Sequence, residues 1–480
     1  MRRQIRVIAA AVAALSISAF EIISAQAPAV WKQVALVKAS KPREGDQLGH
    51  SIALSADGTT MAAGVPMDGS GNNATFSAGA VYVYTRAGDR WAQQGYLRPA
   101  VRGADDQFGS AVALSADGNT LAISAPYEDS SATGINGNAS DNSIKNSGAV
   151  YIFTRSAGNW SQQAYIKASN TGENDDGDQF GYSISLSSDG TTLAVGAIGE
   201  DSAAAGLNGN QSDNTANGAG AVYVFARSGA TWSQQAYVKS SVARPNVMFG
   251  YSVALNQNAD TLAVGEFDAD RGRGALYIFT RNASGWSQQA RLQASNAEPQ
   301  DSLGCWVAIS EDGNTVAAGS LDEDSLLSGV QPGDRGNNDE ATDASAGAAY
   351  VFVRTGGNWS QQAFLKATNP GKENWFGVRV ALSGDGNTLA VSATNESGAS
   401  KGINGRQGND TAPQSGAAYV FTRTGSAWSS NAYVKAADTS EYDEFGSSLA
   451  LSRDGRLLAI GAHFQDGGVA DSGALYVMRR

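Results

Sequence analysis

The stretch DQFGYSISLSSDGTTLAVGA, residues 178–197, holds the pattern that decides the fold of this chain. A Phe-Gly step opens the stretch, and an Asp-Gly pair separates two short apolar runs. Asp-Gly supplies the positive φ angles that a tight hairpin turn needs. The stretch therefore predicts two antiparallel strands, of which the second, small and apolar throughout, is covered on both faces.

Two more predicted strands follow after a polar loop. Residues 220–227 (GAVYVFAR) alternate in polarity and are rich in aromatic and β-branched side chains, as half-buried strands are. Residues 232–240 (WSQQAYVKS) form the most polar of the four runs, which suits an outer edge strand. One unit is therefore four antiparallel strands, with short turns between strands 1 and 2 and between strands 3 and 4.

The unit recurs seven times along the chain. The glycine of its Phe/Leu-Gly step is Gly49, Gly109, Gly181, Gly250, Gly304, Gly377 and Gly446. The tryptophan of its fourth strand is Trp31, Trp91, Trp160, Trp232, Trp286, Trp359 and Trp428. The first tryptophan precedes the first glycine step, and no such tryptophan follows the last step. This offset predicts a closed ring whose last unit takes strands from both ends of the chain.

The predicted fold is all-β, a seven-bladed β-propeller of four-stranded antiparallel blades. The N-terminal strand, residues 31–40, is the outer strand of the last blade and closes the ring by pairing with the inner strands in residues 443–480. The propeller domain spans residues 28–480. Blades 1 to 6 occupy residues 46–100, 106–169, 178–241, 247–295, 301–368 and 373–437.

The first 27 residues predict a signal peptide. Arg2, Arg3 and Arg6 precede an apolar stretch, residues 7–20, that is too short to span a membrane. Cleavage is expected after Ala25 or Ala27, and a retained anchor helix is the alternative. We therefore expect a secreted, periplasmic or cell-surface protein, with no transmembrane segment in the mature chain.

Charge and cysteine content exclude some partners and bonds. The net charge is −12, and such an acidic chain is a poor partner for nucleic acid or anionic lipid, which both need a basic surface. Cys305 is the only cysteine, so no intrachain disulfide is expected, and a buried position is predicted for its small side chain.

The Phe-Gly steps are followed by Gly-Ala-Pro-like steps such as Gly64-Val-Pro66 and Ser124-Ala-Pro126. This combination resembles the FG-GAP repeat of integrin α-subunit propellers and their bacterial relatives, over essentially the whole chain after residue 27. The resemblance implies extracellular recognition or adhesion through the face that carries the 2–3 and 4–1 loops, often with Ca²⁺. The family's calcium-binding hairpin is not matched, because the hairpin at Asp57 offers a single carboxylate where Ca²⁺ needs six to eight oxygens.

The long loops between strands 2 and 3 share a motif rich in acids, amides and glycine. Interleaved carboxylates, amide oxygens and carbonyls are the ligands that Ca²⁺ needs, so these loops are candidate calcium sites. The alternative is a loop rich in Asx turns, whose side chains bond to their own backbone. The candidate ligands are Glu128, Asp129, Asn136, Asn138 and Asp141 in blade 2, and Glu200, Asp201, Asn208, Asn210 and Asp213 in blade 3.

Long loops on a rigid scaffold are where binding usually occurs, and the 2–3 and 4–1 loops leave antiparallel blades on the same face. Trp375 lies in such a loop and could stack on a sugar, although a packing role fits its position as well. His50 and His463 could approach each other but do not make a metal site or a triad. The candidate ligand-binding residues are Asp129, Asp141, Asp201, Asp213, Asp324, Asp410 and Trp375.

The sequence thus predicts a non-enzymatic protein that binds a protein or glycan ligand through its loops, with Ca²⁺ as a possible cofactor. A hydrolase or lyase acting on polysaccharide or lipid, with loop carboxylates as acid and base, is the alternative. That activity would need a carboxylate pair about 5 Å or about 6.5–9.5 Å apart in a deep cleft. A structural component of a surface layer is the third possibility.

Overall fold

The computed structural model describes residues 30–480, except for 70–75, 173–176, 333–343 and 467. The predicted signal peptide, residues 1–27, lies outside the described residues. Residues Trp31–Arg480 form one compact unit. Within the described residues, no helix is long and apolar enough to cross a bilayer.

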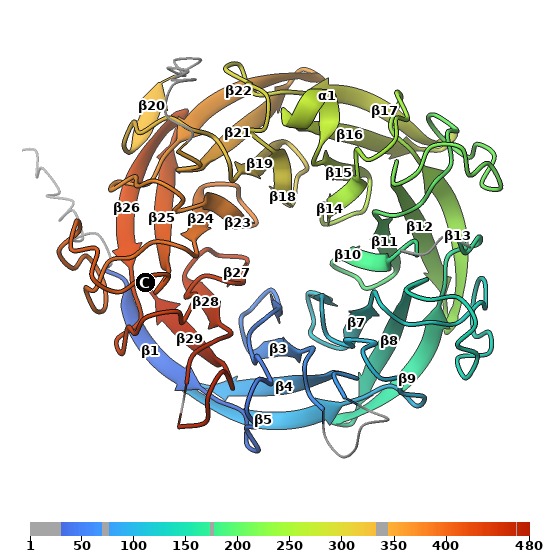
Figure 1. Ribbon diagram of the computed structural model, residues 1–480, viewed down its shortest axis with the longest axis horizontal. Helices are drawn as coiled ribbons and strands as arrows, with labels where there is room; N and C mark the ends of the chain where they lie inside the picture. The colour runs from blue at the N-terminus through green and yellow to red at the C-terminus, as the bar shows by residue number, and fades with distance from the viewer. Residues whose placement is uncertain (1–29, 70–75, 173–176, 333–343, 467) are drawn as a thin grey trace, which may run out of the picture. The chain divides into compact units, whose positions relative to one another are not determined.

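Seven antiparallel sheets stand around a common axis, as Figure 1 shows. Their first strands, which line the axis, are β2 (Ile52–Leu54), β6 (Val112–Leu114), β10 (Phe180–Leu186), β14 (Phe249–Leu255), β18 (Leu303–Ile309), β23 (Phe376–Leu382) and β27 (Leu449–Leu451). The second strands are β3 (Thr60–Val65), β7 (Thr120–Ala125), β11 (Thr192–Ala197), β15 (Thr261–Glu266), β19 (Thr315–Ser320), β24 (Thr388–Ala393) and β28 (Leu457–Ala462).

The outer half of each sheet holds the third and fourth strands. The third strands are β4 (Ala80–Ala87), β8 (Ala149–Ser156), β12 (Ala221–Ser228), β16 (Ala275–Asn282), β21 (Ala348–Thr355), β25 (Ala417–Thr424) and β29 (Ala474–Arg479). The fourth strands are β5 (Arg90–Leu97), β9 (Asn159–Ile166), β13 (Thr231–Val238), β17 (Gly285–Leu292), β22 (Asn358–Leu365), β26 (Ala427–Val434) and, in the last blade, β1 (Lys32–Val37).

The predicted seven-bladed propeller and its closure are confirmed. Strand β1, from the N-terminal end, pairs antiparallel with β29, from the C-terminal end, in the sheet order β1-β29-β28-β27. Figure 1 shows the blue β1 beside the red β29. The side chain of Arg480 lies over the ring of Trp31 at 5.8 Å, so the two chain ends form the same Arg–Trp contact that the third and fourth strands make in other blades.

Two short elements depart from the four-strand pattern. Blade 5 has a fifth strand, β20 (Val330–Pro332), which pairs with the outer strand β22. Blade 4 carries a single turn, α1 (Ala269–Gly272), in which Asp270 and Arg271 have non-helical dihedral angles. Both elements belong to 2–3 loops that fold back onto their own blade.

The core lies between neighbouring blades. In each blade, all six residues of the second strand are buried, as the sequence predicted. They are buried because a neighbouring blade covers each face of the sheet. One hydrophobic cluster, for example, joins Val150 and Ile152 of blade 2 to Leu193 and Val195 of blade 3. Burying such side chains contributes about 1.5–3 kcal/mol each, so blade contact is the main source of stability.

The glycines of the repeat let neighbouring blades approach near the axis. A Cβ added at Gly64 would lie 2.0 Å from the carbonyl oxygen of Gly109 in the next blade. Ser51 donates a hydrogen bond to the same carbonyl at 2.8 Å. Equivalent serine bonds at Ser183, Ser252 and Ser448 fix the inner strands that surround the axis.

A ring of backbone hydrogen bonds surrounds the axis at the 1–2 hairpins. One residue of each 1–2 hairpin, directly before the aspartate of the Asp-Gly pair or the residue in its place, takes part. Its N–H donates to the carbonyl oxygen of the corresponding residue in the next blade. The seven bonds measure 2.8–3.3 Å and run through Ala56, Ala116, Ser188, Gln257, Glu311, Gly384, Arg453 and back to Ala56. Arg453 of blade 7 also pairs with Glu311 of blade 5 at 2.7 Å, so side chains reach across the axis at this end.

Candidate functional site

The 2–3 and 4–1 loops emerge together on one face, which we call the loop-rich face, and the 1–2 and 3–4 hairpins lie on the other. Large exposed hydrophobic side chains are concentrated in the loops of the first face. Six of them lie there: Phe76, Val101, Val242, Leu326, Trp375 and Tyr442. The other three, Val30, Leu36 and Tyr96, lie on outer strands or next to one in sequence. Within the described residues the hairpins carry none of these side chains.

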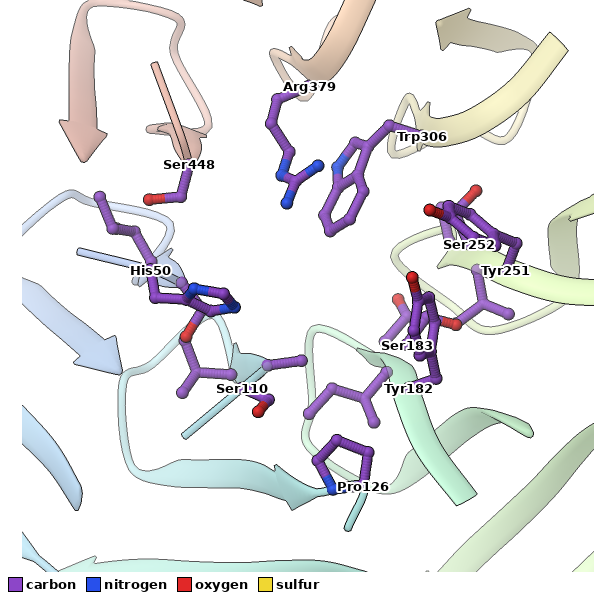
Figure 2. Close-up of a pocket in the computed structure, with 18 of the residues that line it drawn as sticks. His50, Ser110, Pro126, Tyr182, Ser183, Tyr251, Ser252, Trp306, Arg379 and Ser448 are labelled. Carbon is purple, nitrogen blue, oxygen red and sulfur yellow. The ribbon is translucent and has the colours of Figure 1, made fainter. Parts of the chain in front are cut away.

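A cavity of about 470 Å³ lies on the axis. Its lining comes from the first strands of the blades and from Gln107, Pro126 and Tyr127, which belong to loops of the loop-rich face. Figure 2 shows the labelled side chains arranged around the central space. Since the backbone ring and the Arg453–Glu311 ion pair narrow the hairpin end of the axis, we expect ligands to enter this cavity from the loop-rich face.

Arg379 is the only charged residue among those that line the cavity, apart from the titratable His50. Its guanidinium carbon lies 4.2 Å from the ring centroid of Trp306, and Figure 2 shows the two groups side by side at the cavity. Its Nη1 donates to the carbonyl oxygen of Val378 at 3.0 Å. Within the described chain no carboxylate lies within ion-pair distance of Arg379. The cavity therefore presents a positive charge that forms no direct ion pair. Burial raises the pKa of the nearby acid Glu444, and the charge of Arg379 opposes this effect.

Aromatic rings form the wall beside this charge. Tyr182 and Tyr251 lie with ring centroids 5.0 Å apart, and Tyr251 stacks on Phe267 at 4.6 Å. Burial raises the pKa of Tyr182 above its usual value, and the neighbouring Tyr251 adds to this effect. The Tyr182 hydroxyl therefore stays protonated and can donate a hydrogen bond.

His50 and His463 meet where the first and last blades adjoin, with ring centroids 5.6 Å apart. Burial lowers the pKa of His50 to about 4 and that of His463 to about 3, and the charge of Arg379 acts in the same direction. Both rings are therefore neutral at neutral pH. The Nδ1 atom of each is buried and has no hydrogen-bond partner. His50 lines the cavity, so its imidazole ring lies beside a bound molecule.

Seven residues, one directly before the Phe/Leu-Gly step of each blade, form a rim around the axis at the loop-rich face. All seven have positive φ angles, between 50° and 63°, which is uncommon for residues other than glycine. They are Gln47, Gln107, Gln179, Met248, Ser302, Trp375 and Glu444. Trp375, predicted as a ligand-binding residue, is 37% exposed on this rim but does not line the cavity.

The two glutamates among the predicted calcium ligands are buried in ion pairs. Glu128 accepts from Lys167 Nζ at 2.6 Å and from the Tyr165 hydroxyl at 2.7 Å. Glu200 accepts from Lys239 at 2.5 Å and from Tyr237 at 2.6 Å. Each lysine occupies a carboxylate oxygen that a calcium ion would need.

The predicted amide ligands bond to the protein backbone. Asn136 donates its N–H to the carbonyl oxygen of Tyr165, and its Oδ1 accepts the Tyr165 N–H at 2.9 Å. Asn208 makes the same pair of bonds with Tyr237 in blade 3. The side chains of Asn138 and Asn210 accept from backbone N–H groups two residues later, as in Asx turns.

The remaining predicted acids lie in separate loops of the loop-rich face. Asp129, Asp201 and Asp324 accept backbone N–H groups of their own loops. Asp141 and Asp213 accept from Ser143 and Thr215 in local turns. Asp410 lines a small loop cavity with Lys372. Over the described ranges, no three His, Cys, Asp or Glu side chains gather closely enough to hold a metal. Calcium binding in these loops stays a prediction.

Comparison with known proteins identifies the repeat. The FG-GAP repeat family profile matches residues 91–153, 160–225, 232–279, 359–421 and 428–478. The chain belongs to the FG-GAP repeat family. The resemblance inferred from the Phe-Gly and Gly-Ala-Pro-like steps is thereby confirmed as an FG-GAP repeat propeller.

One solved structure similar to this FG-GAP propeller is the hydrazine synthase of Kuenenia stuttgartiensis. The two share 14% sequence identity, with a TM-score of 0.50 over 92% of this chain and 97% of that chain. At this identity the likeness shows a common fold alone. No curated protein sequence gives a significant match to the chain.

Sequence reasoning did not single out Arg379. The residue two positions after the glycine of each Phe-Gly step is Ser51, Ala111, Ser183, Ser252, Trp306, Arg379 and Ser448. Alignment of the repeats at this position would have shown one charged and one large aromatic residue among small ones. The sequence therefore marks Trp306 and Arg379 as unusual at this position, but their contact becomes evident only when the blades are arranged in a ring.

Proposed function

We propose that this FG-GAP propeller is a binding protein that recognises a macromolecule or glycan through its loop-rich face, centred on the axial cavity. The cavity carries the proposal, because it joins an unpaired guanidinium, aromatic rings and hydroxyl groups at the end of the axis where ligands can enter. The six exposed hydrophobic side chains in the loops of the same face extend the contact surface. Location outside the cytoplasm is part of the proposal and rests on the N-terminal segment alone.

The lining of the cavity favours binding over hydrolysis. A glycosidase needs two carboxyl groups that flank the scissile bond. None of the described residues that line the axial cavity is an aspartate or a glutamate. Apart from Asp410, the predicted loop carboxylates are instead engaged with lysines or with backbone N–H groups of their own loops, as described above.

The proposal is tested by screening the purified protein against an oligosaccharide array and a displayed random peptide library. We expect the double variant Trp375→Ala/Tyr442→Ala to lose affinity for the ligand found by at least about tenfold, because exposed aromatic residues often dominate binding energy. Thr231→Ala, on an exposed 3–4 hairpin of the opposite face, serves as the control and leaves affinity unchanged. Equal losses in both variants, or no binding in either screen, would contradict the proposal.

A further inference from the structure

We infer that the axial cavity binds a sugar residue that bears a carboxylate, with Arg379 pairing with the carboxylate and the aromatic wall receiving the sugar ring. The inference rests on the proposed function and names the chemical class of its ligand. Three features of the cavity support it: its charge, its shape and the aromatic and hydroxyl groups of its lining.

The charge of Arg379 calls for an anion. Arg379 is half-buried at the cavity, and within the described residues no acid lies within ion-pair distance of its guanidinium, so a ligand anion can pair with it directly. The acid on the rim, Glu444, contacts His463 at 3.5 Å. The neutral His50 adds no second positive charge to the cavity. The site is therefore suited to one negative charge, not to a polyanion, which the net charge of −12 would also repel.

The geometry around Arg379 favours a planar anion. The indole of Trp306 lies against the guanidinium at 4.2 Å and restricts its orientation. A guanidinium held in one plane binds a carboxylate through two parallel hydrogen bonds. Trp306 is therefore a positioning residue for Arg379.

The rest of the cavity matches a hydroxylated ring. Tyr182 and Tyr251 form an aromatic surface against which the apolar face of a sugar can pack. Serine side chains of the inner strands, among them Ser51, Ser183 and Ser252, also line the cavity and give it hydroxyl groups. A volume of about 470 Å³ lies within the usual range for small-molecule sites, so a single sugar or the end of a chain is accommodated.

The test is a calorimetric titration of the full protein with galacturonate and glucuronate, and with galactose and glucose as neutral counterparts. We expect the acids to bind and the neutral sugars to bind at least about tenfold more weakly, since a charged hydrogen-bonded pair contributes most of the difference. Arg379→Gln should lower acid affinity to the level of the neutral sugars. Arg379→Lys, which keeps the charge and loses the planar fork, should fall between the two.

Arg354→Gln is the matched control, because Arg354 also stacks on a tryptophan, Trp359 at 5.3 Å, but on the outer strands of blade 5. This variant should bind the acids like the unmodified protein. Equal binding of acidic and neutral sugars, equal affinity in Arg379→Gln, or no sugar binding at all would overturn the inference. The proposed function would still stand in each case if the array or the peptide library yields a ligand whose binding depends on Trp375 and Tyr442.

Discussion

The buried acid–base pairs show how single positions change together in six of the seven repeats, whereas blade 7 pairs Lys38 with the neutral Gln465 at 3.0 Å. Blades 2, 3, 5 and 6 each bury a glutamate from the start of the 2–3 loop against a lysine at the end of the fourth strand. Blade 1 has Asp68 and Arg98 at these positions, paired at 2.7 Å. In blade 4 both charges are absent, since Ala269 and Gln293 occupy the equivalent positions. Because blade 4 lacks both the acid and the base, it does not bury one charged side chain without its counter-ion, which would destabilise the fold.

A second repeated residue makes the stability of the ring depend on pH. In five blades, the residue two positions before the phenylalanine or leucine of the Phe/Leu-Gly step is a buried aspartate. Burial raises its pKa to about 7 in Asp106, Asp178 and Asp301, and to about 6 in Asp46 and Asp443. Since folding raises these pKa values, the stabilisation is complete below the unfolded value near 3.9 and is lost as pH rises through about 6–7.

We therefore predict that Asp106→Asn reduces the pH dependence of unfolding. The thermal midpoint of the unmodified protein should lose several degrees between pH 6 and 8 as these carboxyl groups ionise. The amide in the variant stays neutral, so its midpoint should fall less over the same range. Asp57→Asn is the control, because hydrogen bonds hold the pKa of this hairpin carboxyl below its usual value and it does not titrate in this range. Parallel curves for Asp106→Asn and the unmodified protein would refute the prediction.

At the scale of elements, the Gly-Ile/Leu-Asn-Gly segments act as partial fifth strands. Ile135, Leu207 and Ile403 each form a single β-bridge with the end of their blade's outer strand. In blade 5 the same contact extends into β20, which pairs with β22. An outer strand exposes unpaired backbone groups, and these segments cover the end of that edge nearest the loop-rich face. The segments are thus part of the blade as well as part of the loop.

We predict that Asn208→Ala loosens this cover in blade 3. The variant removes the acceptor of the Tyr237 N–H, which lies 3.0 Å from Asn208 Oδ1. It also places alanine at a φ of 52°, where asparagine is tolerated better. Hydrogen exchange of the Tyr237 amide, followed by mass spectrometry, should become about tenfold faster. Asn210→Ala serves as the control, because the side chain of Asn210 accepts from the Ser212 N–H in its own turn and not from the outer strand. Unchanged exchange in both variants would contradict the prediction.

These segments also show where sequence reasoning was sufficient. Blade number, strand order and ring closure follow from the repeat, because each depends on local turns and on alternation of polarity. The role of the loop acids does not, since a sequence shows which oxygens are present but not which donors they meet. The sequence predicted Glu128 as a calcium ligand, whereas the structure shows that its carboxylate accepts a hydrogen bond from Lys167, 39 residues later. Arg379 was missed for the same reason, because its environment comes from other blades.

At the scale of the whole molecule, closure depends on contacts between the two ends of the chain. Strand β1 pairs only with β29, and Trp31 Nε1 donates to Asn431 of blade 6 at 3.0 Å. Beyond β1, the backbone N–H of Leu48 donates to Ser472, and Ser448 Oγ donates to Gly49. The junction is therefore held by one outer strand and by contacts close to the axis. Removal of β1 should open the outer edge of blade 7 and leave the inner contacts alone to close the ring.

We predict that deletion of residues 28–40 lowers the thermal midpoint of the whole propeller by about 10 °C or more, because it exposes the edge of β29 and the apolar surface that Trp31 covers. A synthetic peptide of residues 30–41 should restore the midpoint in proportion to its concentration, since a ligand bound only by the folded state stabilises it. A peptide with Trp31→Ala should restore less, and a scrambled peptide nothing. An unchanged midpoint after deletion would mean that blade packing closes the ring without β1, and rescue by the scrambled peptide would show that pairing with β29 is not the cause.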